Sequence, residues 1–472
     1  MRVFLVVLVI VGLLCAYPPP AAGAAPRTLD RNLDPVIVAG QALPAFSGVS
    51  LAQLFVYAYL GSAWFQIPSQ LDEVSNGLIV ASEDSKLDAN DQLVFMGADT
   101  GDQAPADAWI ADINSMQYPR YEIEVTDPTS PAKKGWVYVY RSATLANTVV
   151  SDYVNYETGP RLTRANNYVL RLIQNRIGID RLEMNGSGIN ILDRTKLRGY
   201  TQSRTFTEED IPNYPSPVMI RDGRVRIVMS LRTGPTEHIR MIGYRSRFEY
   251  NVWHLALPPN ATGGRLSVDQ SPAAAGHVYY DANNVTGTTV DGIPDTPTVT
   301  PPTLWFQVSG STGTCVVVVD YQGAEKVSTY YKDDKTADPA DTGDKMSYGD
   351  VGLYTGKPAA EVALVLIGYV LPPQQPRVGS AYESYVRQPL ASQSREQRFS
   401  GPTPSPSATL TATRTATMTP TRTATVTTTP TRTRTLTVTP TLRWTLTPTH
   451  TTTPGSARLL YLPVILRAAR HE

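Results

Sequence analysis

The stretch VMIRDGRVRI at residues 218–227 decides the fold class of this chain. Apolar and β-branched residues lie on both sides of Asp222-Gly223, and Asp-Gly supplies the positive φ angles that a two-residue hairpin turn needs. The stretch therefore predicts a β-hairpin. Similar strand-like runs occupy residues 54–60, 63–68, 93–96, 121–125, 136–140 and 316–319.

Short strands with frequent turns and no long amphipathic helix predict an all-β fold. The apolar run at 359–371 is rich in valine and also suits a strand. We expect two β-sandwich domains, a smaller one at 25–158 and a larger one at 159–392, with the boundary near Glu157-Thr158-Gly159-Pro160. A single fused sandwich is the alternative.

Net charge excludes one broad class of partner. The 472 residues contain 42 Lys+Arg and 42 Asp+Glu, so the chain lacks the basic excess typical of nucleic-acid binding proteins. The charge is unevenly spread, however. Residues 161–250 contain 16 basic and 9 acidic residues, a balance of +7, whereas residues 281–360 contain 5 lysines and 11 acidic residues, a balance of −6.

The first 24 residues predict export. Arg2 precedes an apolar run at 3–16, prolines follow, and Ala22-Gly23-Ala24 suits a cleavage site for a secretory signal peptide. The apolar run is too short for a stable membrane span, so we expect no transmembrane helix in the mature chain. Lipid attachment at Cys15 is the rival interpretation. Without Cys15 a single cysteine remains, Cys315, in an apolar run typical of a buried strand, where a packed, inert thiol is expected.

Residues 393–455 predict a disordered stalk. Within 403–453 there are 25 threonines, no acidic residue and regularly spaced prolines. Such a segment has no continuous apolar face to bury and should stay extended, and threonine mixed with proline is typical of O-glycosylated stalks. A short apolar segment at 456–472 follows.

The stalk followed by YLPVILR at 461–467 resembles the C-terminal arrangement of a group of secreted bacterial surface proteins. In that group different globular parts precede the same stalk and terminal motif. The resemblance implies retention at the cell surface or sorting to it, with an extracellular or cell-surface location. The alternative is a terminal strand that docks on the globular part.

The N-terminal part carries a second resemblance. WFQIPSQLDE at 64–73 and LDANDQLVF at 87–95 are similar to the PxQxDE and DxxDELVF pattern of secreted β-sandwich proteins, some of them associated with polysaccharide degradation. Gln92 stands where that pattern has an acid. The resemblance implies a secreted β-sandwich.

Four residues crowd one turn and suggest a metal: Asp84, Asp88, Asn90 and Asp91. Clustered carboxylate and amide oxygens suit Ca²⁺, the one cofactor that the sequence suggests. The alternative is a turn that these side chains cap themselves, without metal. Two further acid-rich loops, at 291–295 and 333–350, raise the same two possibilities.

Five residues are candidates for ligand binding. Arg194, Lys196 and Arg198 alternate, so on a strand they would share one face and suit an anionic polysaccharide. Pairing of these cations with the acidic segment is the alternative. Trp253 and its neighbour His254 are candidates for a sugar-stacking surface.

Local catalytic signatures are absent: the chain has no nucleophile elbow, no phosphate-binding loop and no zinc motif. We therefore expect an exported, surface-displayed protein that binds an extracellular glycan or a cell-surface partner without catalysis. A polysaccharide lyase or glycoside hydrolase is the enzymatic alternative, because its distant catalytic residues would leave no local motif. A structural coat component is the third interpretation.

Overall fold

Strands dominate the structure, and the predicted all-β class is confirmed. Among the described residues there is one α-helix, α1 (Gly379–Arg387), which the sequence did not lead us to expect. The computed structural model describes residues 25–81, 84–210, 217–233, 236–252, 260–322, 327–356 and 363–401. The predicted signal peptide, most of the predicted stalk and the C-terminal segment lie outside these residues.

Two antiparallel sheets form the N-terminal sandwich, in the strand orders β1-β7-β4 and β28-β8-β9-β2-β3. Their facing sides bury an apolar core that includes Phe46, Phe95 and Ile123. The strands are β1 (Pro35–Ala39), β2 (Leu54–Leu60), β3 (Ala63–Gln66), β4 (Ser69–Asp72), β7 (Gln92–Met96), β8 (Arg120–Thr126), β9 (Lys134–Arg141) and β28 (Ala391–Gln397), beside a small hairpin of β5 (Val74–Ser75) and β6 (Leu78–Ile79).

The turn between β2 and β3 follows from its sequence. Gly61 and Ser62 have φ angles of 53° and 72°, and Leu60 pairs with Ala63 across them. Two successive positive φ angles match the right-handed twist of the flanking strands, and glycine adopts them without steric cost. Local sequence therefore determines this hairpin.

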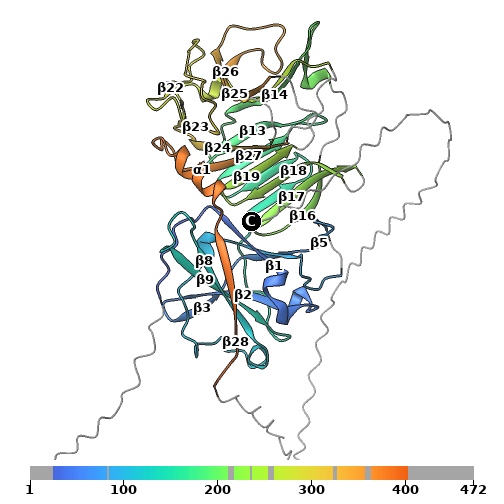
Figure 1. The fold of residues 1–472 in the computed structure, drawn as a ribbon, viewed down its shortest axis with the longest axis vertical. Coiled ribbons are helices and arrows are strands. Elements are labelled where there is room, and N and C mark those ends of the chain that lie inside the picture. The colour runs from blue at the N-terminus through green and yellow to red at the C-terminus, as the bar shows by residue number, and fades with distance from the viewer. Residues whose placement is uncertain are drawn as a thin grey trace, which may run out of the picture. The chain divides into compact units, whose positions relative to one another are not determined.

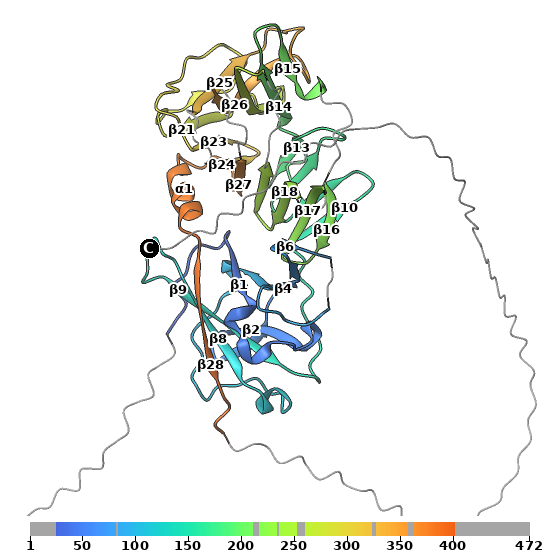
Figure 2. The ribbon, with the colours of Figure 1, turned by 45° about the vertical axis from the view of Figure 1, so that its right-hand side comes forward.

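Three antiparallel sheets form the second sandwich, in the orders β10-β11-β12-β13, β15-β14-β20-β26-β25 and β16-β17-β18-β19-β27-β24-β23-β21-β22 (Figures 1 and 2). Their strands are β10 (Val154–Glu157), β11 (Leu162–Ala165), β12 (Tyr168–Leu172), β13 (Ile179–Met184), β14 (Leu192–Tyr200), β15 (Thr205–Thr207), β16 (Val218–Asp222), β17 (Arg226–Thr233), β18 (Thr236–Tyr244), β19 (Arg247–Val252), β20 (Gly263–Gln270), β21 (Val278–Asp281), β22 (Thr288–Thr289), β23 (Trp305–Gly310), β24 (Gly313–Gln322), β25 (Val327–Asp334), β26 (Ser347–Thr355) and β27 (Ala363–Leu371).

One continuous apolar core joins these three sheets, with Leu170, Leu266 and Val317 each contributed by a different sheet. The boundary that we placed near residues 157–160 falls in the turn of the β10–β11 hairpin, which belongs to this second group of sheets. The apolar run at 359–371 contains β27, at the centre of the largest sheet.

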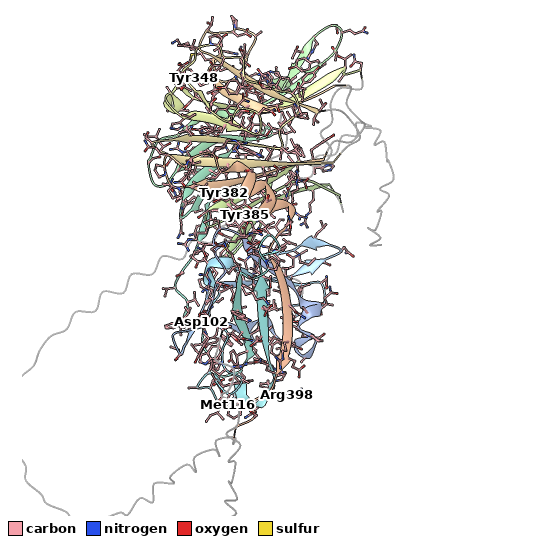
Figure 3. All side chains as sticks on the ribbon, turned by 60° about the vertical axis from the view of Figure 1, so that its left-hand side comes forward. Asp102, Met116, Tyr348, Tyr382, Tyr385 and Arg398 are labelled. Atoms are coloured by element: carbon pink, nitrogen blue, oxygen red, sulfur yellow. The ribbon has the colours of Figure 1, made fainter. Side chains whose placement is uncertain are left out.

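After β27 the chain returns to the N-terminal sandwich. Helix α1 contacts the face of β23 and β24, and β28 then pairs with β8 over its whole length (Figures 1 and 2). Two tyrosines of α1, Tyr382 and Tyr385, lie between the two sandwiches (Figure 3). The guanidinium group of Arg31 stacks on Tyr385, with 4.4 Å between Cζ and the ring centre. Residues 393–397, which we had assigned to the disordered stalk, therefore form part of a strand.

The 218–227 hairpin is present, but its turn differs from the predicted two-residue Asp-Gly turn. Asp222 pairs with Ile227, which leaves four residues in the loop, and Gly223 does not have a positive φ angle. Oε1 of Gln70 accepts hydrogen bonds from the backbone N–H groups of residues 225 (3.1 Å) and 226 (3.0 Å). A Cβ atom at Gly223 would lie 2.2 Å from the Gln70 side chain. A contact from the N-terminal sandwich therefore replaces the local turn preference.

Asp99, which lies where the N-terminal sandwich contacts the second sandwich, has a perturbed pKa. Oδ1 of Asp99 accepts a hydrogen bond from the Tyr153 hydroxyl (2.7 Å), and Arg245 stacks on the Tyr153 ring. Burial raises the pKa of Asp99 to about 6, although Tyr153 and nearby arginines oppose that rise. In the folded protein Asp99 therefore holds its proton to a higher pH than it would in the unfolded chain.

The perturbed pKa of Asp99 predicts a pH dependence. The stabilising contribution of its bound proton is fully present below about pH 3.8 and is lost as pH rises through about 6. Asp99→Asn imitates the protonated form at every pH. The free energy of unfolding of the variant relative to the parent should therefore rise by about 2–3 kcal/mol as the pH goes from 4 to 7. Urea unfolding across this range would measure the difference. A constant difference at every pH would contradict the prediction.

Candidate functional site

The three basic residues that we predicted to share a face all lie on β14, at alternate positions. Lys196 and Arg198 are buried, however, and only Arg194 keeps a partly exposed side chain. All three pair with carboxylates. Arg194 pairs with Glu209, whereas Lys196 and Arg198 both pair with Asp341, which belongs to the acidic segment named above. The structure therefore agrees with the pairing alternative for Lys196 and Arg198.

The ammonium group of Lys196 lies inside the protein between carboxylates. Its Nζ atom is 2.5 Å from Oδ2 of Asp269, and it donates hydrogen bonds to Oδ2 of Asp341 (2.7 Å) and to the backbone oxygen of Met346 (3.0 Å). Burial alone would lower the pKa of Lys196, but attraction to Asp269 and Asp350 outweighs this effect and raises it. Lys196 therefore remains charged in the interior.

Arg198 connects the same strand to two covering segments. It donates a hydrogen bond to Oε2 of Glu208 (2.6 Å), on the 3-10 turn at 208–210, and forms an ion pair with Asp341. The Thr342 hydroxyl also accepts a hydrogen bond from Arg198 (2.9 Å). These contacts cover the outer side of β14 and remove Lys196 and Arg198 from any ligand-binding surface.

Three carboxylates in this cluster have the spacing of metal ligands. Asp193, Asp269 and Asp344 each offer an oxygen within 4.8 Å of the others. Burial, followed by repulsion from Asp350, raises the pKa of Asp269 well above its usual value. The Lys196 ammonium already lies against Asp269 and supplies positive charge there. We interpret the cluster as an ion-pair network that holds the covering segments.

The predicted calcium ligands hold their own turn. Asp91 is buried, and its two oxygens accept hydrogen bonds from the backbone N–H groups of Val74 (2.9 Å) and Asp88 (2.7 Å). Oδ1 of Asp84 accepts one from the backbone two residues later (2.8 Å), and the Asn90 amide donates to the Val74 backbone oxygen. These bonds favour the turn-capping alternative, and a calcium role remains a prediction.

The tryptophans that the structure describes pack against other side chains. Trp253 and His254 lie outside the described residues. Trp136 and Trp305 are buried in apolar clusters. Trp109 packs against the guanidinium group of a buried arginine of β8, 4.4 Å from the ring centre. A stacking role for Trp253 thus stays a prediction.

Arg194 lines an open groove of about 600 Å³ on the second sandwich. Arg161 lies in the turn before β11, Arg171 on β12 and Arg176 in the turn after β12. These three segments each place a guanidinium group beside that of Arg194 on β14, so four guanidinium groups line the groove. Of the residues that the structure describes, the acids in the groove are Asp180 and Glu209. Four arginines and two acids leave a formal excess of two positive charges.

Ion pairs orient most of these arginines. Arg171 donates two hydrogen bonds to Asp180, at 2.7 and 3.1 Å, in a bidentate arrangement. Glu209 accepts from both Arg176 (3.1 Å) and Arg194 (2.6 Å). The structure shows no ion pair for Arg161 among the residues that it describes. The groove therefore presents held guanidinium groups with unused donors, an arrangement suited to carboxylate or sulfate groups.

Sequence reasoning identified only Arg194 of this groove. The other arginines are 18 to 33 positions away in sequence, and no local motif connects them. The +7 balance of residues 161–250 was the signal that could have led to them, because it marked the whole basic segment.

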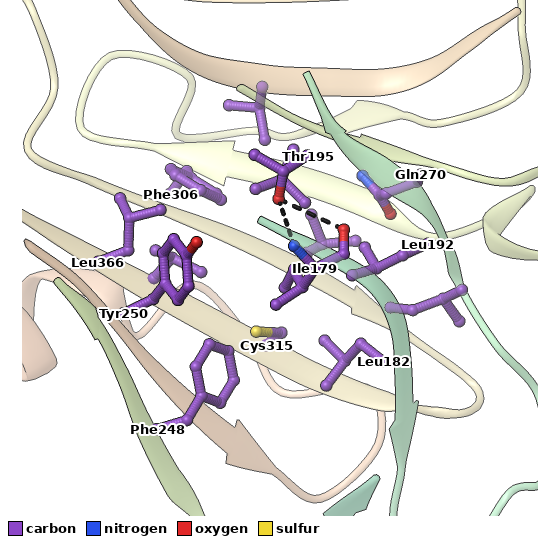
Figure 4. Close-up of a pocket in the computed structure, with 15 residues that line it drawn as sticks. Ile179, Leu182, Leu192, Thr195, Phe248, Tyr250, Gln270, Phe306, Cys315 and Leu366 are labelled. Carbon is purple, nitrogen blue, oxygen red and sulfur yellow. Dashed lines mark hydrogen bonds between the residues drawn. The ribbon is translucent and has the colours of Figure 1, made fainter. Parts of the chain in front are cut away.

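A small apolar cavity lies between the two largest sheets of the second sandwich (Figure 4). Its volume is about 50 Å³, and Phe248, Phe306 and Leu366 are among the residues that line it. Cys315 also lines it, and burial raises the pKa of its thiol to about 12, so the thiol is inert. An apolar cavity of about 150 Å³ can hold benzene, and this cavity has only a third of that volume, so it is too small for a sugar.

No known protein family and no curated protein sequence matches this chain. Within the described residues, no helix has the length and apolar character needed to cross a bilayer.

Proposed function

We propose that this protein is exported, displayed at the cell surface, and binds an extracellular anionic polysaccharide without catalysis. The observation that carries the proposal is the groove of Arg161, Arg171, Arg176 and Arg194, with its excess of guanidinium groups. Uronate carboxylates and sulfate esters are planar or compact anions that arginine binds in a bidentate manner. The predicted signal peptide and the predicted stalk support the proposal of export and display.

The open groove also suits a polymer. It is an open depression on one side of the second sandwich, and its arginines come from several segments, so successive anionic units could contact different guanidinium groups. Glu209 and Asp180 hold these groups in place before a ligand arrives, which lowers the entropy that binding must overcome.

Arg161→Gln combined with Arg171→Gln should weaken binding of polygalacturonate about tenfold or more, because each charge-assisted hydrogen bond contributes about 1.5–3 kcal/mol. Isothermal titration calorimetry of the full chain at two salt concentrations would measure the loss and its salt dependence. Glutamine keeps much of the side-chain length, so the fold should tolerate both changes.

Arg398→Gln is the matched control, because this arginine lies on the N-terminal sandwich side and its side chain is 72% exposed. The control should bind like the parent. Equal affinity of the double variant and the control would contradict the groove assignment, and new reducing or unsaturated ends in the polysaccharide would contradict a non-catalytic role. A reporter fused to residues 401–472 that is wholly released into the medium would contradict display.

A further inference from the structure

A second groove, of about 470 Å³, lies near one end of the largest sheet of the second sandwich. One wall comes from β21 and the residues before it, including His277 and Tyr280. Ser309 lies beside it on β23, which pairs with β21, and Ser311 lies at the tip of the β23–β24 hairpin. The segment that contains Gln374 completes the lining. None of these residues belongs to the arginine groove or to the ion-pair network.

The base of this groove is firmly held. The Ser309 hydroxyl donates a hydrogen bond to the backbone oxygen of Gln375 (2.9 Å), and the backbone N–H of Gln374 donates to Gly310 (3.1 Å). The ring of His277 lies directly against Gly310, where a Cβ atom would be 1.7 Å from Cδ2 of the ring. A glycine is therefore required at position 310, and the walls are fixed before any ligand binds.

The chemistry of this groove is uncharged. Among the described residues, no Lys, Arg, Asp or Glu lines it. Burial lowers the pKa of His277, so its imidazole is neutral at neutral pH. Tyr280 offers part of an aromatic ring, while Ser311 and Gln374 are exposed and offer a hydroxyl and an amide. An aromatic face beside hydroxyl and amide groups matches a sugar ring, with its apolar C–H face and its hydroxyl groups.

We propose that this groove binds an uncharged sugar unit, so that the second sandwich has two glycan sites of different chemistry. The inference rests on the proposed glycan-binding function and extends it to neutral sugars. A polysaccharide with both charged and neutral units would then contact the protein twice, which raises its overall affinity when both sites are reached at once.

Tyr280→Ala should weaken binding of a neutral hexaose about tenfold, because the aromatic surface is lost. Calorimetry of the full chain with cellohexaose and with maltohexaose would measure this loss for two linkage types. Gln374→Gly provides an independent test. The side chain of Gln374 is exposed and its backbone φ angle is 54°, which glycine adopts readily, so the fold should not change. It should weaken binding severalfold.

Phe65→Ala is the matched control, because it removes a half-exposed aromatic side chain from β3 of the N-terminal sandwich. It should bind both hexaoses like the parent. Binding of polygalacturonate without any binding of either hexaose would overturn this inference and leave the arginine groove intact. Hexaose binding that Tyr280→Ala and Gln374→Gly leave unchanged would also overturn it. Failure of both ligand classes would instead refute the proposed function.

Discussion

Replacing Asp72 by alanine is expected to lower the free energy of unfolding by about 3–5 kcal/mol, because it leaves a buried guanidinium group without its carboxylate. Asp72 is fully buried at the junction of the two sandwiches. Its oxygens accept hydrogen bonds from Nε of Arg226 (2.8 Å), Nε of Arg221 (3.1 Å) and Nε2 of Gln70 (2.7 Å). Arg226 is itself only 2% exposed and cannot recover this loss through water.

Urea unfolding followed by tryptophan fluorescence would measure the effect of Asp72→Ala. The double variant Asp72→Ala with Arg226→Met should recover much of the lost stability, because it removes the unpaired charge. Arg204→Ala is the control: it breaks a surface ion pair with Asp210 and should cost less than about 1 kcal/mol. A loss from Asp72→Ala as small as that of the control would contradict the role assigned to this junction.

Lys196→Met should have an effect of similar size, about 3–5 kcal/mol, for the opposite reason: the buried carboxylates lose their cation. Asp269 is fully buried against Lys196, and Asp341 pairs with it from the covering segment. The loss should shrink as pH falls from 8 to 5. Because burial already raises the pKa of Asp269, a proton can replace the missing ammonium charge more easily at lower pH.

Chemical unfolding at pH 5, 6.5 and 8 would test Lys196→Met. Lys134→Met serves as the control, since this lysine pairs with Glu124 at the surface, and it should cost less than about 1 kcal/mol at every pH. A loss that is independent of pH would show that packing, and not charge, is what Lys196 provides. A loss below 1 kcal/mol would contradict the buried network altogether.

The motif noted in the N-terminal part has a clear structural setting. Gln70 and Asp72 come from its first half and Gln92 from its second, and all three contact the β16–β17 hairpin. Nη2 of Arg226 donates to Oε1 of Gln92 (2.7 Å), at the position where the similar pattern has an acid. These residues bind a partner strand of the same chain, which local spacing could not indicate.

The candidate site was only partly accessible to sequence reasoning. Alternation correctly placed Arg194, Lys196 and Arg198 on one strand, because side-chain direction in a strand is a local property. Whether these side chains are exposed is not a local property. Asp341, the acidic residue that covers Lys196 and Arg198, lies more than 140 positions later in the chain. Arg194 alone remained available to a ligand, beside arginines that no motif connects to it.

By itself, the sequence determined the all-β class, the β2–β3 hairpin with its turn at Gly61 and Ser62, and the strand around Cys315. These features depend on alternation and on the φ preferences of single residues, which act over a few positions. Tertiary structure decided the turn after Asp222, the burial of Lys196 and the return of β28 to the N-terminal sandwich. Each of these depends on hydrogen bonds and charge pairs between segments far apart in the chain, and their free energy outweighs the local preference only once the chain has folded.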